Sequence, residues 1–333
     1  MKKSAIHPNH SYFLGLDVGG SKTHALIADE SGNALSLGIA GPGNHETVGY
    51  EQMTQVLLDI TDQALAGAGI DRKQLHGSGF GIAGLDWDSE LPAMQTAIAP
   101  LNLSCPLELV NDAVIGLVAG AKAGWGVAVV AGTGCNCVGR DEDHKIGRMT
   151  GYGDTMAEAA GAGELVAKAV QAVSLAWSRR GKPTAISQTM IELCSARDLD
   201  DLIEGLCTFR YFVDAPFAPR IFDLAEAGDE VAGDLIRWAG EQLGSLALGV
   251  IRQLGFEDKV FEIVLVGRMF EGGARLIDPL GQVVQAVAPK ARLIRLEVPP
   301  VVGGVLLGME KVGARKDDTH RRLIETARVL FQD

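Results

Sequence analysis

The chain contains two short segments of the same design, and this duplication constrains the fold more than any other feature. The first is LDVGGSKTHALIAD, beginning at Leu16, and the second is VVAGTGCNCVGRD, beginning at Val129. Each places a glycine-rich polar turn between two apolar strand-like stretches. Such a turn is either a plain hairpin or a loop whose bare N–H groups bind an anion. Because the arrangement recurs in both halves, we favour anion binding and expect two similar domains that face each other across a cleft.

The elements around the two segments predict an α/β chain. The first half reads as strands at 12–18, 22–29 and 34–40, joined by tight turns as antiparallel neighbours, followed by alternating helices and strands. The second half starts again with three strands within 125–149. We expect an N-terminal domain over 12–113, a C-terminal domain over 114–313 with a helical insertion at about 155–254, a C-terminal helix over 314–333 that packs on the N-terminal domain, and a disordered leader over 1–11.

Composition limits the partners and the compartment. The 333 residues include 30 Lys and Arg against 42 Asp and Glu, a net charge of −12, which disfavours nucleic acid or an anionic membrane as a partner. No stretch approaches the ~20 apolar residues of a membrane helix, and no apolar run follows the N-terminal lysines as in a signal peptide. Five irregularly spaced cysteines indicate reduced thiols and a cytoplasmic protein.

The first glycine-rich turn offers several groups suited to phosphate. Its glycines can adopt positive φ and leave backbone N–H groups bare, while the next three residues add two hydroxyls and a positive charge. Asp17 ends a buried strand, where a carboxylate is unfavourable unless it is solvated or faces a cation such as hydrated Mg²⁺ on a nucleotide. The alternative is a plain hairpin with a surface Asp. The predicted phosphate-binding residues of this turn are Gly19, Gly20, Ser21, Lys22 and Thr23.

The second turn and a later glycine cluster extend the nucleotide prediction. The turn AGTGCNC supplies Gly132, Thr133 and Gly134 for phosphate, with Asn136 just beyond them. Further on, VLVGRMFEGG places Gly267, Gly272 and Gly273 where bare backbone could let an adenine ring lie flat. The C-x-C pair in the second turn lacks further ligands at zinc-site spacing, so we interpret Cys135 and Cys137 as buried free thiols.

Asp112 follows a buried strand, in VNDA, and precedes a helix. The ends of parallel strands are where α/β sheets place ligands. An Asp there could accept the proton of a substrate hydroxyl that attacks phosphorus. It could also be the N-cap of the helix, a role that Asn111 could fill instead.

Two further features favour a polar organic ligand and a close contact between helices. GPGNH places Asn44 and His45 between a strand and a helix, and both side chains suit sugar hydroxyls and amides. The alternative is an ordinary loop pair. In PPVVGGVLLGME, Gly303 and Gly304 interrupt an apolar helical run, and such small residues allow two helices to touch, as a hinge between lobes would need.

Taken in order, these motifs resemble a known set. LGLDVGGSKTHALIAD, VNDA, VVAGTGCNC, VLVG…GG and PVVGGVLLG resemble the five motifs of the actin-like ATPase and sugar kinase superfamily. Within it, residues 12–313 resemble the BadF/BadG/BcrA/BcrD ATPase family, and most of all its N-acetylglucosamine kinases. The resemblance implies two ribonuclease-H-like domains around a central cleft that holds ATP, Mg²⁺ and an amino sugar.

The resemblance also implies roles for single residues. Asp17 would orient Mg²⁺ through water, the two turns would hold the phosphates, and Asp112 would be the base for the sugar 6-hydroxyl. Asn44, Thr133 and Asn136 would line the sugar pocket, where His45 is a further candidate. The chain departs from the family's GDEGS segment, because GYGDTMAEAAGAGE places Glu158 at the acidic position with Asp154 as a second candidate. A longer acid there suits the free amine of glucosamine better than a muramic-type lactyl acid.

The sequence therefore predicts an ATP-dependent kinase for the 6-hydroxyl of N-acetylglucosamine or glucosamine, acting as a homodimer. The alternative within the family is a nucleotide-driven switch that activates a partner protein. Such activators need a cysteine that binds an iron–sulfur cluster, and no matching cluster motif occurs here. A sugar sensor without catalysis would carry a DNA-binding segment, for which the expected leader is too short.

Overall fold

The computed structural model describes residues 10–332, apart from the side chain of Asp317, and most of the expected leader, 1–9, lies outside this range. Two compact units share the chain. The first unit combines residues up to 128 with 140–144 and 294 onward, and the second contains 129–139 and 145–293. Within residues 10–332, no helix is both long enough and apolar enough to span a membrane.

The first unit is built on a five-stranded sheet with the order β3-β2-β1-β4-β5. Its strands are β1 (Tyr12–Val18), β2 (Thr23–Asp29), β3 (Ala34–Ala40), β4 (Leu75–Ile82) and β5 (Leu107–Asn111). The first three are consecutive antiparallel neighbours, as the tight turns predicted. β4 and β5 run parallel to β1, so the ends of β1, β4 and β5 lie at one edge of the sheet.

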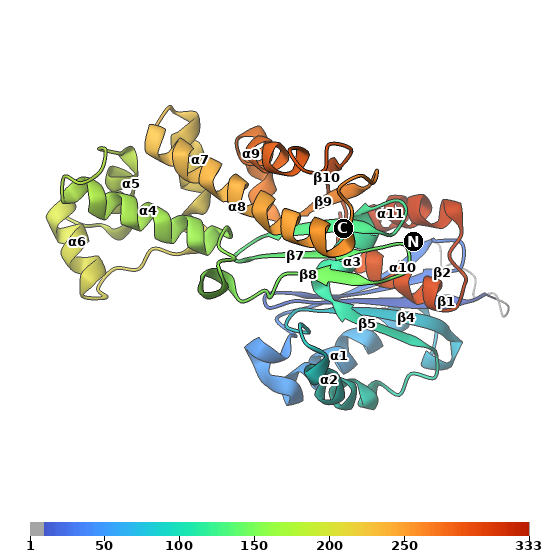
Figure 1. Ribbon diagram of the computed structural model, residues 1–333. Coiled ribbons are helices and arrows are strands. Elements are labelled where there is room, and N and C mark those ends of the chain that lie inside the picture. The colour runs from blue at the N-terminus through green and yellow to red at the C-terminus, as the bar shows by residue number, and fades with distance from the viewer. Residues whose placement is uncertain (1–9, 333) are drawn as a thin grey trace. The chain divides into compact units, whose positions relative to one another are not determined.

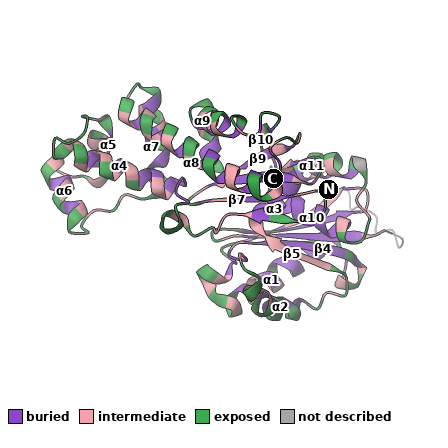
Figure 2. Cartoon of the chain, viewed as in Figure 1, coloured by how far each residue is buried: buried purple, intermediate pink, exposed green. Residues whose placement is uncertain are grey.

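Helices α1 (His45–Ala68) and α2 (Leu91–Ile98) cover one face of this sheet (Figure 1). The strands and α1 form a fully apolar core in which Met53, Leu57 and Ile60 pack on the alternate residues of β1 and β2. Figure 2 shows strands β1 and β4 largely buried. Gly49 is non-helical, with φ of 77°, so the first turn of α1 is separated from the long helix that follows it.

The other face is covered by α3 (Asp112–Gly120), α10 (Val301–Lys311) and α11 (Asp317–Leu330). Glycines bring α10 into direct contact with its neighbours. A Cβ on Gly79 of β4 would lie 2.3 Å from the Gly304 carbonyl oxygen, and one on Gly303 would lie 1.9 Å from that of Ile115 in α3. The predicted close contact of two helices is therefore present, and it joins α10 to the first unit.

The composition of the units differs from the expected domain boundaries. Residues 114–313 were expected in the C-terminal domain, yet α3 and α10 both pack on the first sheet. Helix α11 lies along β3, where the Thr326 hydroxyl accepts from Ala34 N at 2.9 Å and donates to the Gly32 carbonyl at 3.1 Å. Arg140 similarly ties its short segment to the first unit by pairing with Glu310 of α10.

The strands of the second sheet follow the order β10-β9-β6-β7-β8. They are β6 (Gly126–Ala131), β7 (Cys135–Arg140), β8 (Ile146–Arg148), β9 (Glu262–Val266) and β10 (Arg292–Arg295). The helices of this unit are α4 (Ala162–Trp177), α5 (Ala185–Cys194), α6 (Leu199–Cys207), α7 (Ala218–Glu226), α8 (Glu230–Leu254) and α9 (Ala274–Gln285). The helical stretch predicted at about 155–254 thus contains α4 to α8.

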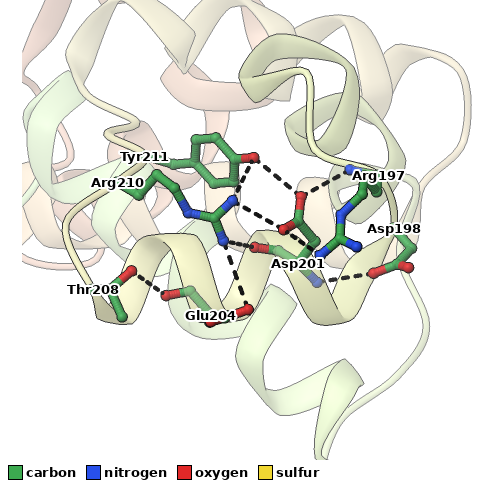
Figure 3. Close-up of polar contacts among 7 residues, drawn as sticks. All are labelled: Arg197, Asp198, Asp201, Glu204, Thr208, Arg210 and Tyr211. Atoms are coloured by element: carbon green, nitrogen blue, oxygen red, sulfur yellow. Dashed lines mark hydrogen bonds and ion pairs between the residues drawn. The ribbon is translucent and has the colours of Figure 1, made fainter.

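A buried carboxylate in the first turn of α6, Asp201, connects the segments that precede and follow this helix, as Figure 3 shows. The Asp201 side chain is 2% exposed and accepts hydrogen bonds from the Arg197 side chain and from Arg210, each at 3.0 Å, and from the Tyr211 hydroxyl at 3.1 Å. The Arg197 backbone N donates a further bond at 3.0 Å. Every acceptor direction of this carboxylate is therefore used inside the second unit, and its role is structural.

Candidate functional site

The first glycine-rich turn connects β1 to β2 and leaves Gly20, Ser21 and Lys22 exposed. Neither of its glycines has a positive φ, so the turn does not use that freedom of the glycine backbone. The requirement for glycine is instead a close approach, since a Cβ on Gly19 would lie 2.9 Å from the Lys22 carbonyl oxygen. Gly43 N donates to the Gly19 carbonyl at 3.1 Å, which fixes the turn against the GPGNH loop.

Thr23 was predicted to offer its hydroxyl to phosphate, but its side chain is fully buried. A Cβ on Gly43 would lie 2.4 Å from the Thr23 Oγ1 atom, so this loop residue covers the hydroxyl. Among residues 10–332 the hydroxyl has no hydrogen-bond partner. The exposed polar side chains of the turn are therefore those of Ser21 and Lys22.

Asn44 and His45 lie beside the first turn, at the start of α1. Asn44 is 4% exposed, and its Oδ1 atom has no hydrogen-bond partner in the described part of the chain. A Cβ on Gly20 would lie 3.7 Å from that atom. The His45 ring stacks on Tyr50 with ring centroids 4.7 Å apart, and its buried Nδ1 is likewise unpaired among these residues. Buried polar atoms without partners are rare in folded proteins, and they often indicate a ligand or a water.

Asp112 is the first residue of α3, directly after β5. Asp112 does not cap this helix. Its neighbour Asn111 is the N-cap, and the Asn111 Oδ1 atom accepts a hydrogen bond from Ala113 N at 2.9 Å. Desolvation, and then the negative charges of Asp17 and Asp86, raise the pKa of Asp112 to about 7. A carboxylate with such a pKa can accept and release a proton near neutral pH, as a general base must.

Asp17 lies at the same sheet edge as Asp112, because it pairs with Gly81 of β4, which in turn pairs with Val110, two residues before Asp112. No group of three or more His, Cys, Asp or Glu that could hold a metal ion occurs within the described residues. The predicted role of Asp17 was to hold Mg²⁺ through water, which needs no such group. Carboxylate oxygens suit this hard cation, and a cation here would relieve the repulsion that raises the pKa of Asp112. The donor set therefore fits Mg²⁺.

His24, which no motif had indicated, stands directly opposite Asp17 across the β1–β2 pair. Strands predicted to end at 18 and to begin at 22 would pair Asp17 with Thr23. The observed turn is one residue longer, which moves His24 opposite Asp17. The second carboxylate that acts on Asp112 is held by the strand end itself, since Asn111 Nδ2 donates to Asp86 Oδ1 at 2.9 Å. Asp86 lies in the loop that follows β4.

The second glycine-rich turn belongs to the second unit and rests on the start of α4. Ala162 N donates to the Gly132 carbonyl and Gly163 N to the Thr133 carbonyl, each at 2.9 Å. A Cβ on Gly132 or Gly134 would meet no atom within 4 Å, and Thr133 is exposed. The first amides of α4 thus support the turn, while the other side of the turn stays open.

The polar residues predicted to line the sugar pocket in this unit differ in availability. Asn136 uses its Oδ1 to accept from Cys137 N at 2.7 Å. Glu158 is 5% exposed, and its carboxylate accepts from Thr150 N at 2.7 Å and from Gly151 N at 2.8 Å. Asp154 is exposed on a 3₁₀ turn over Gly153–Met156. Glu158 therefore orders its own loop, and Asp154 is the acid that faces solvent.

The three glycines predicted to receive adenine are also unequal. Gly267 has φ of 113°, and a Cβ there would lie 2.3 Å from the Ala131 carbonyl oxygen. Gly272 packs on the Phe222 ring, since its Cβ would lie 2.2 Å from a ring carbon. Only Gly273, with φ of 67°, has no atom within 4 Å of an added Cβ. The open glycine surface of this cluster is thus at the N-terminal end of α9.

The thiols of the second turn are buried, as predicted. Burial raises the pKa of Cys135 to about 11 and raises that of Cys137 still further. The Cys135 thiol donates to the Glu158 carbonyl at 3.1 Å. All five cysteines are free, and these two are in no position to reach a ligand at the surface.

Comparisons with known proteins agree with this arrangement of motifs. The chain is 24% identical over 300 residues to the N-acetylmuramic acid/N-acetylglucosamine kinase of Clostridium acetobutylicum, which covers 89% of this chain and 97% of that protein. It is also 24% identical over 317 residues to the N-acetyl-D-glucosamine kinase of Dictyostelium discoideum, and this alignment too covers 89% of this chain and 97% of that protein.

Solved structures share the fold. A candidate N-acetylglucosamine kinase from Chromobacterium violaceum matches with a TM-score of 0.65 at 20% identity, over 90% of this chain and 99% of that one. A ROK family glucokinase from Streptomyces griseus, in complex with glucose and AMPPNP, matches with a TM-score of 0.54 at 17% identity, over 91% and 100%. The predicted α/β fold of the actin-like ATPase type is confirmed. A family model matches residues 14–308, so the chain belongs to the BadF/BadG/BcrA/BcrD ATPase family.

Proposed function

We propose that this protein is an ATP-dependent kinase that phosphorylates the 6-hydroxyl of an amino sugar, N-acetylglucosamine or glucosamine. The observation that carries the proposal is the environment of Asp112. It directly follows a parallel strand, the helix is capped by Asn111 instead, and the pKa of Asp112 is raised to about 7. Both curated relatives have names that describe kinases of N-acetylated amino sugars, and the family to which the chain belongs is one of ATPases.

Asp112 is the general base of the proposed reaction. Its carboxylate takes the proton of the sugar 6-hydroxyl while the hydroxyl oxygen forms a bond to the γ-phosphorus of ATP. The bond from that phosphorus to the bridging oxygen breaks, and ADP leaves. Proton transfer by a positioned side chain typically contributes 10²–10⁴-fold to rate, and the rest comes from positioning and charge stabilisation.

The first turn contributes Ser21, Lys22 and the exposed backbone of Gly20 to the phosphates, whereas the predicted Gly19 N–H is engaged by the Lys22 carbonyl at 3.0 Å. Asp17 would hold Mg²⁺ through water, and the ion would supply positive charge to the phosphate oxygens. Asn44, with its unpaired buried amide oxygen, and His45 contact the sugar. Thr23 does not contact the phosphates, because its hydroxyl is covered.

In the second unit, the open turn Gly132–Gly134 contacts phosphate, and the surface at Gly273 contacts adenine. Thr133 and Asn136 contact the sugar. Asp154 replaces Glu158 as the acid that faces an amine or amide substituent, because Glu158 is engaged by Thr150 and Gly151. A carboxylate near the substituent favours glucosamine or N-acetylglucosamine over a sugar with a lactyl acid.

A coupled ADP-release assay tests the proposal with glucosamine, N-acetylglucosamine, N-acetylmannosamine, N-acetylmuramic acid and glucose. We expect release to be stimulated by an amino sugar, with the phosphate located on C6 by phosphorus–proton NMR coupling. Release that ignores every sugar but rises with a partner protein would overturn the kinase in favour of a nucleotide-driven switch. The proposal also includes a cytoplasmic homodimer that binds neither nucleic acid nor membrane, which light scattering and cell fractionation test.

A further inference from the structure

Asp17 has one polar side chain among its cross-strand neighbours. The register places Asp17 opposite His24 on β2 and opposite Gly81 on β4. Gly81 has no side chain, and neither has Gly15, the residue two places earlier on the same face of β1. His24 is therefore the only directly adjacent strand residue that can orient the Asp17 carboxylate.

The contact between the two side chains is close but not yet a hydrogen bond. His24 Nδ1 lies 3.6 Å from Asp17 Oδ2, and the two side chains are only 18% and 17% exposed. The same Nδ1 is buried and has no hydrogen-bond partner among the described residues. Leaving a buried donor unmet is unfavourable. Hydrogen bonds in active sites are often long without ligands and shorten in the complex.

The His24 ring is supported from the end of the chain. The edge of the Phe331 ring meets the His24 ring at a centroid distance of 5.4 Å and an angle of 72°. Phe331 follows α11, which is fixed along β3 by the Thr326 hydrogen bonds and by the fully buried side chains of Leu323 and Ala327. Phe331 thus holds the His24 ring from a helix that begins near residue 317.

We propose that His24 is a positioning residue for Asp17: its Nδ1–H orients the carboxylate for Mg²⁺–nucleotide binding, and Phe331 holds its ring in place. This inference rests on the proposed function only in taking Asp17 as the carboxylate that faces the metal. No proton moves in this role, since the ring only donates one hydrogen bond. His24 itself touches neither nucleotide nor sugar.

Three substitutions separate positioning from packing. His24→Phe keeps a ring against Phe331 and removes the donor. His24→Asn removes the ring but returns an N–H near the position of Nδ1. Phe331→Ala removes the support and leaves the donor. His76→Phe, at an exposed residue of β4 in the same sheet, is the matched control.

The first readout is the part of the ADP-induced rise in Tm that requires Mg²⁺, measured with Mg²⁺ and with EDTA. We expect His24→Phe to lose most of it, and Phe331→Ala to lose less. His24→Asn and His76→Phe should keep it. In turnover, the Mg²⁺ concentration that gives half-maximal velocity should rise about 10-fold in His24→Phe, with the KM for the sugar unchanged. A ¹⁵N spectrum of wild-type His24 should show the Nδ1–H tautomer and respond to Mg²⁺ with ADP, not to ADP alone.

The inference is overturned if His24→Phe keeps the full Mg²⁺-dependent rise, or if His24→Asn fails as badly as His24→Phe. It is also overturned if the wild type itself shows no Mg²⁺-dependent stabilisation by ADP. The two proposals can fail separately. A wild type that phosphorylates no sugar, yet loses Mg²⁺-dependent ADP stabilisation on His24→Phe, removes the kinase and leaves the role of His24 standing.

Discussion

Two buried or half-buried carboxylates, Asp112 in the first unit and Asp201 in the second, are treated in opposite ways by the fold. Asp201 receives donors from Arg197, Arg210 and Tyr211, and these hydrogen bonds hold its pKa well below the usual range (Figure 3). Asp112 has lost solvation beside two further carboxylates, and its pKa is raised to about 7. Burial is common to both groups, whereas charge compensation is present at only one.

The difference separates a structural carboxylate from a functional one. A fold that only needs to be stable satisfies its buried charges, as around Asp201. At the end of β5 the fold instead leaves a carboxylate with like charges nearby, and the segments that flank the first turn bury unpaired polar atoms of Thr23, Asn44 and His45. Unmet polar groups and a perturbed pKa together are typical of a site that a ligand completes.

The largest expected effect is on catalysis by Asp112→Asn. Asparagine fits the same space but cannot accept the proton, so we expect kcat to fall by about 10²–10⁴-fold. Binding of ATP, followed by its effect on Tm, should remain. Asp88→Asn, at an exposed carboxylate of the same unit, is the control and should keep full activity. Turnover by Asp112→Asn at the wild-type rate would exclude Asp112 as the base.

Although Asp112→Asn should lower kcat, the raised pKa of Asp112 means that this substitution should increase the stability of the protein at neutral pH. The folded carboxyl keeps a proton that the unfolded chain has already lost, so its contribution is fully present below about pH 4 and is lost as the pH rises to about 7. The Tm of Asp112→Asn should therefore match that of the wild type near pH 4 and exceed it above pH 7. For the same reason, wild-type kcat/KM should fall as the pH drops below about 7.

At Asp201 we predict the reverse for both quantities: the substitution should lower Tm and leave kcat unchanged. Asp201→Asn removes the counter-charge that Arg197 and Arg210 share, so Arg210 keeps only its longer pair with Glu204, at 3.7 Å. The substitution thereby weakens the contacts between α6 and its flanking segments. We expect Tm to fall by several degrees at neutral pH while kcat per folded molecule is unchanged. Because the pKa of Asp201 is lowered, its contribution is present above about pH 4 and is lost only at still lower pH.

The surface carboxylate Asp223, which is 67% exposed in α7, provides the control for this substitution. Asp223→Asn should leave Tm unchanged within about 1 °C, since exposed pairs contribute little. Loss of activity in Asp201→Asn without loss of stability would mean that the contrast between the two carboxylates is not one of structure against function.

The sequence predicted local features of both regions better than distant ones. Strand ends and hairpin turns follow from neighbouring residues, so Asp17 and Asp112 could be placed at the edge of a sheet without any structure. The choice between Asn111 and Asp112 as the cap, and the inward orientation of Glu158, depend on local hydrogen bonds. These bonds depend on the path of a loop, which the periodicity of the sequence does not reveal. Gly272 meets Phe222 from 50 positions away, and α10 reaches β1 across nearly the whole chain, so neither contact leaves a local signal.

A third prediction isolates the electrostatic part of the Asp112 environment. Asp86→Asn removes a negative charge near Asp112 but keeps an oxygen that can accept from Asn111 Nδ2. The apparent pKa in the pH profile of kcat/KM should therefore move below that of the wild type, with little change in the plateau. Since desolvation and Asp17 act more strongly, the shift should be only part of the whole elevation. An unchanged profile would mean that Asp86 is not felt at Asp112.

The smallest expected effect comes from the exposed edge of the Asp201 cluster. The Arg197 side chain is 78% exposed, so its ion pair with Asp201 is weakened by solvent, and Arg210 and Tyr211 still satisfy the carboxylate after Arg197→Gln. We expect Tm to fall by no more than about 2 °C, and 0.5 M NaCl to shrink the difference further. Arg210→Gln should lower Tm further than Arg197→Gln does. Arg210 also donates to the Asp201 carbonyl at 3.4 Å and stacks on Tyr211, with its guanidinium carbon 4.7 Å from the ring centroid. An equal fall in Tm for Arg197→Gln and Arg210→Gln would mean that net charge alone stabilises the cluster. The number of cations around Asp201, and not the geometry of their hydrogen bonds, would then be what sets Asp201 apart from Asp112.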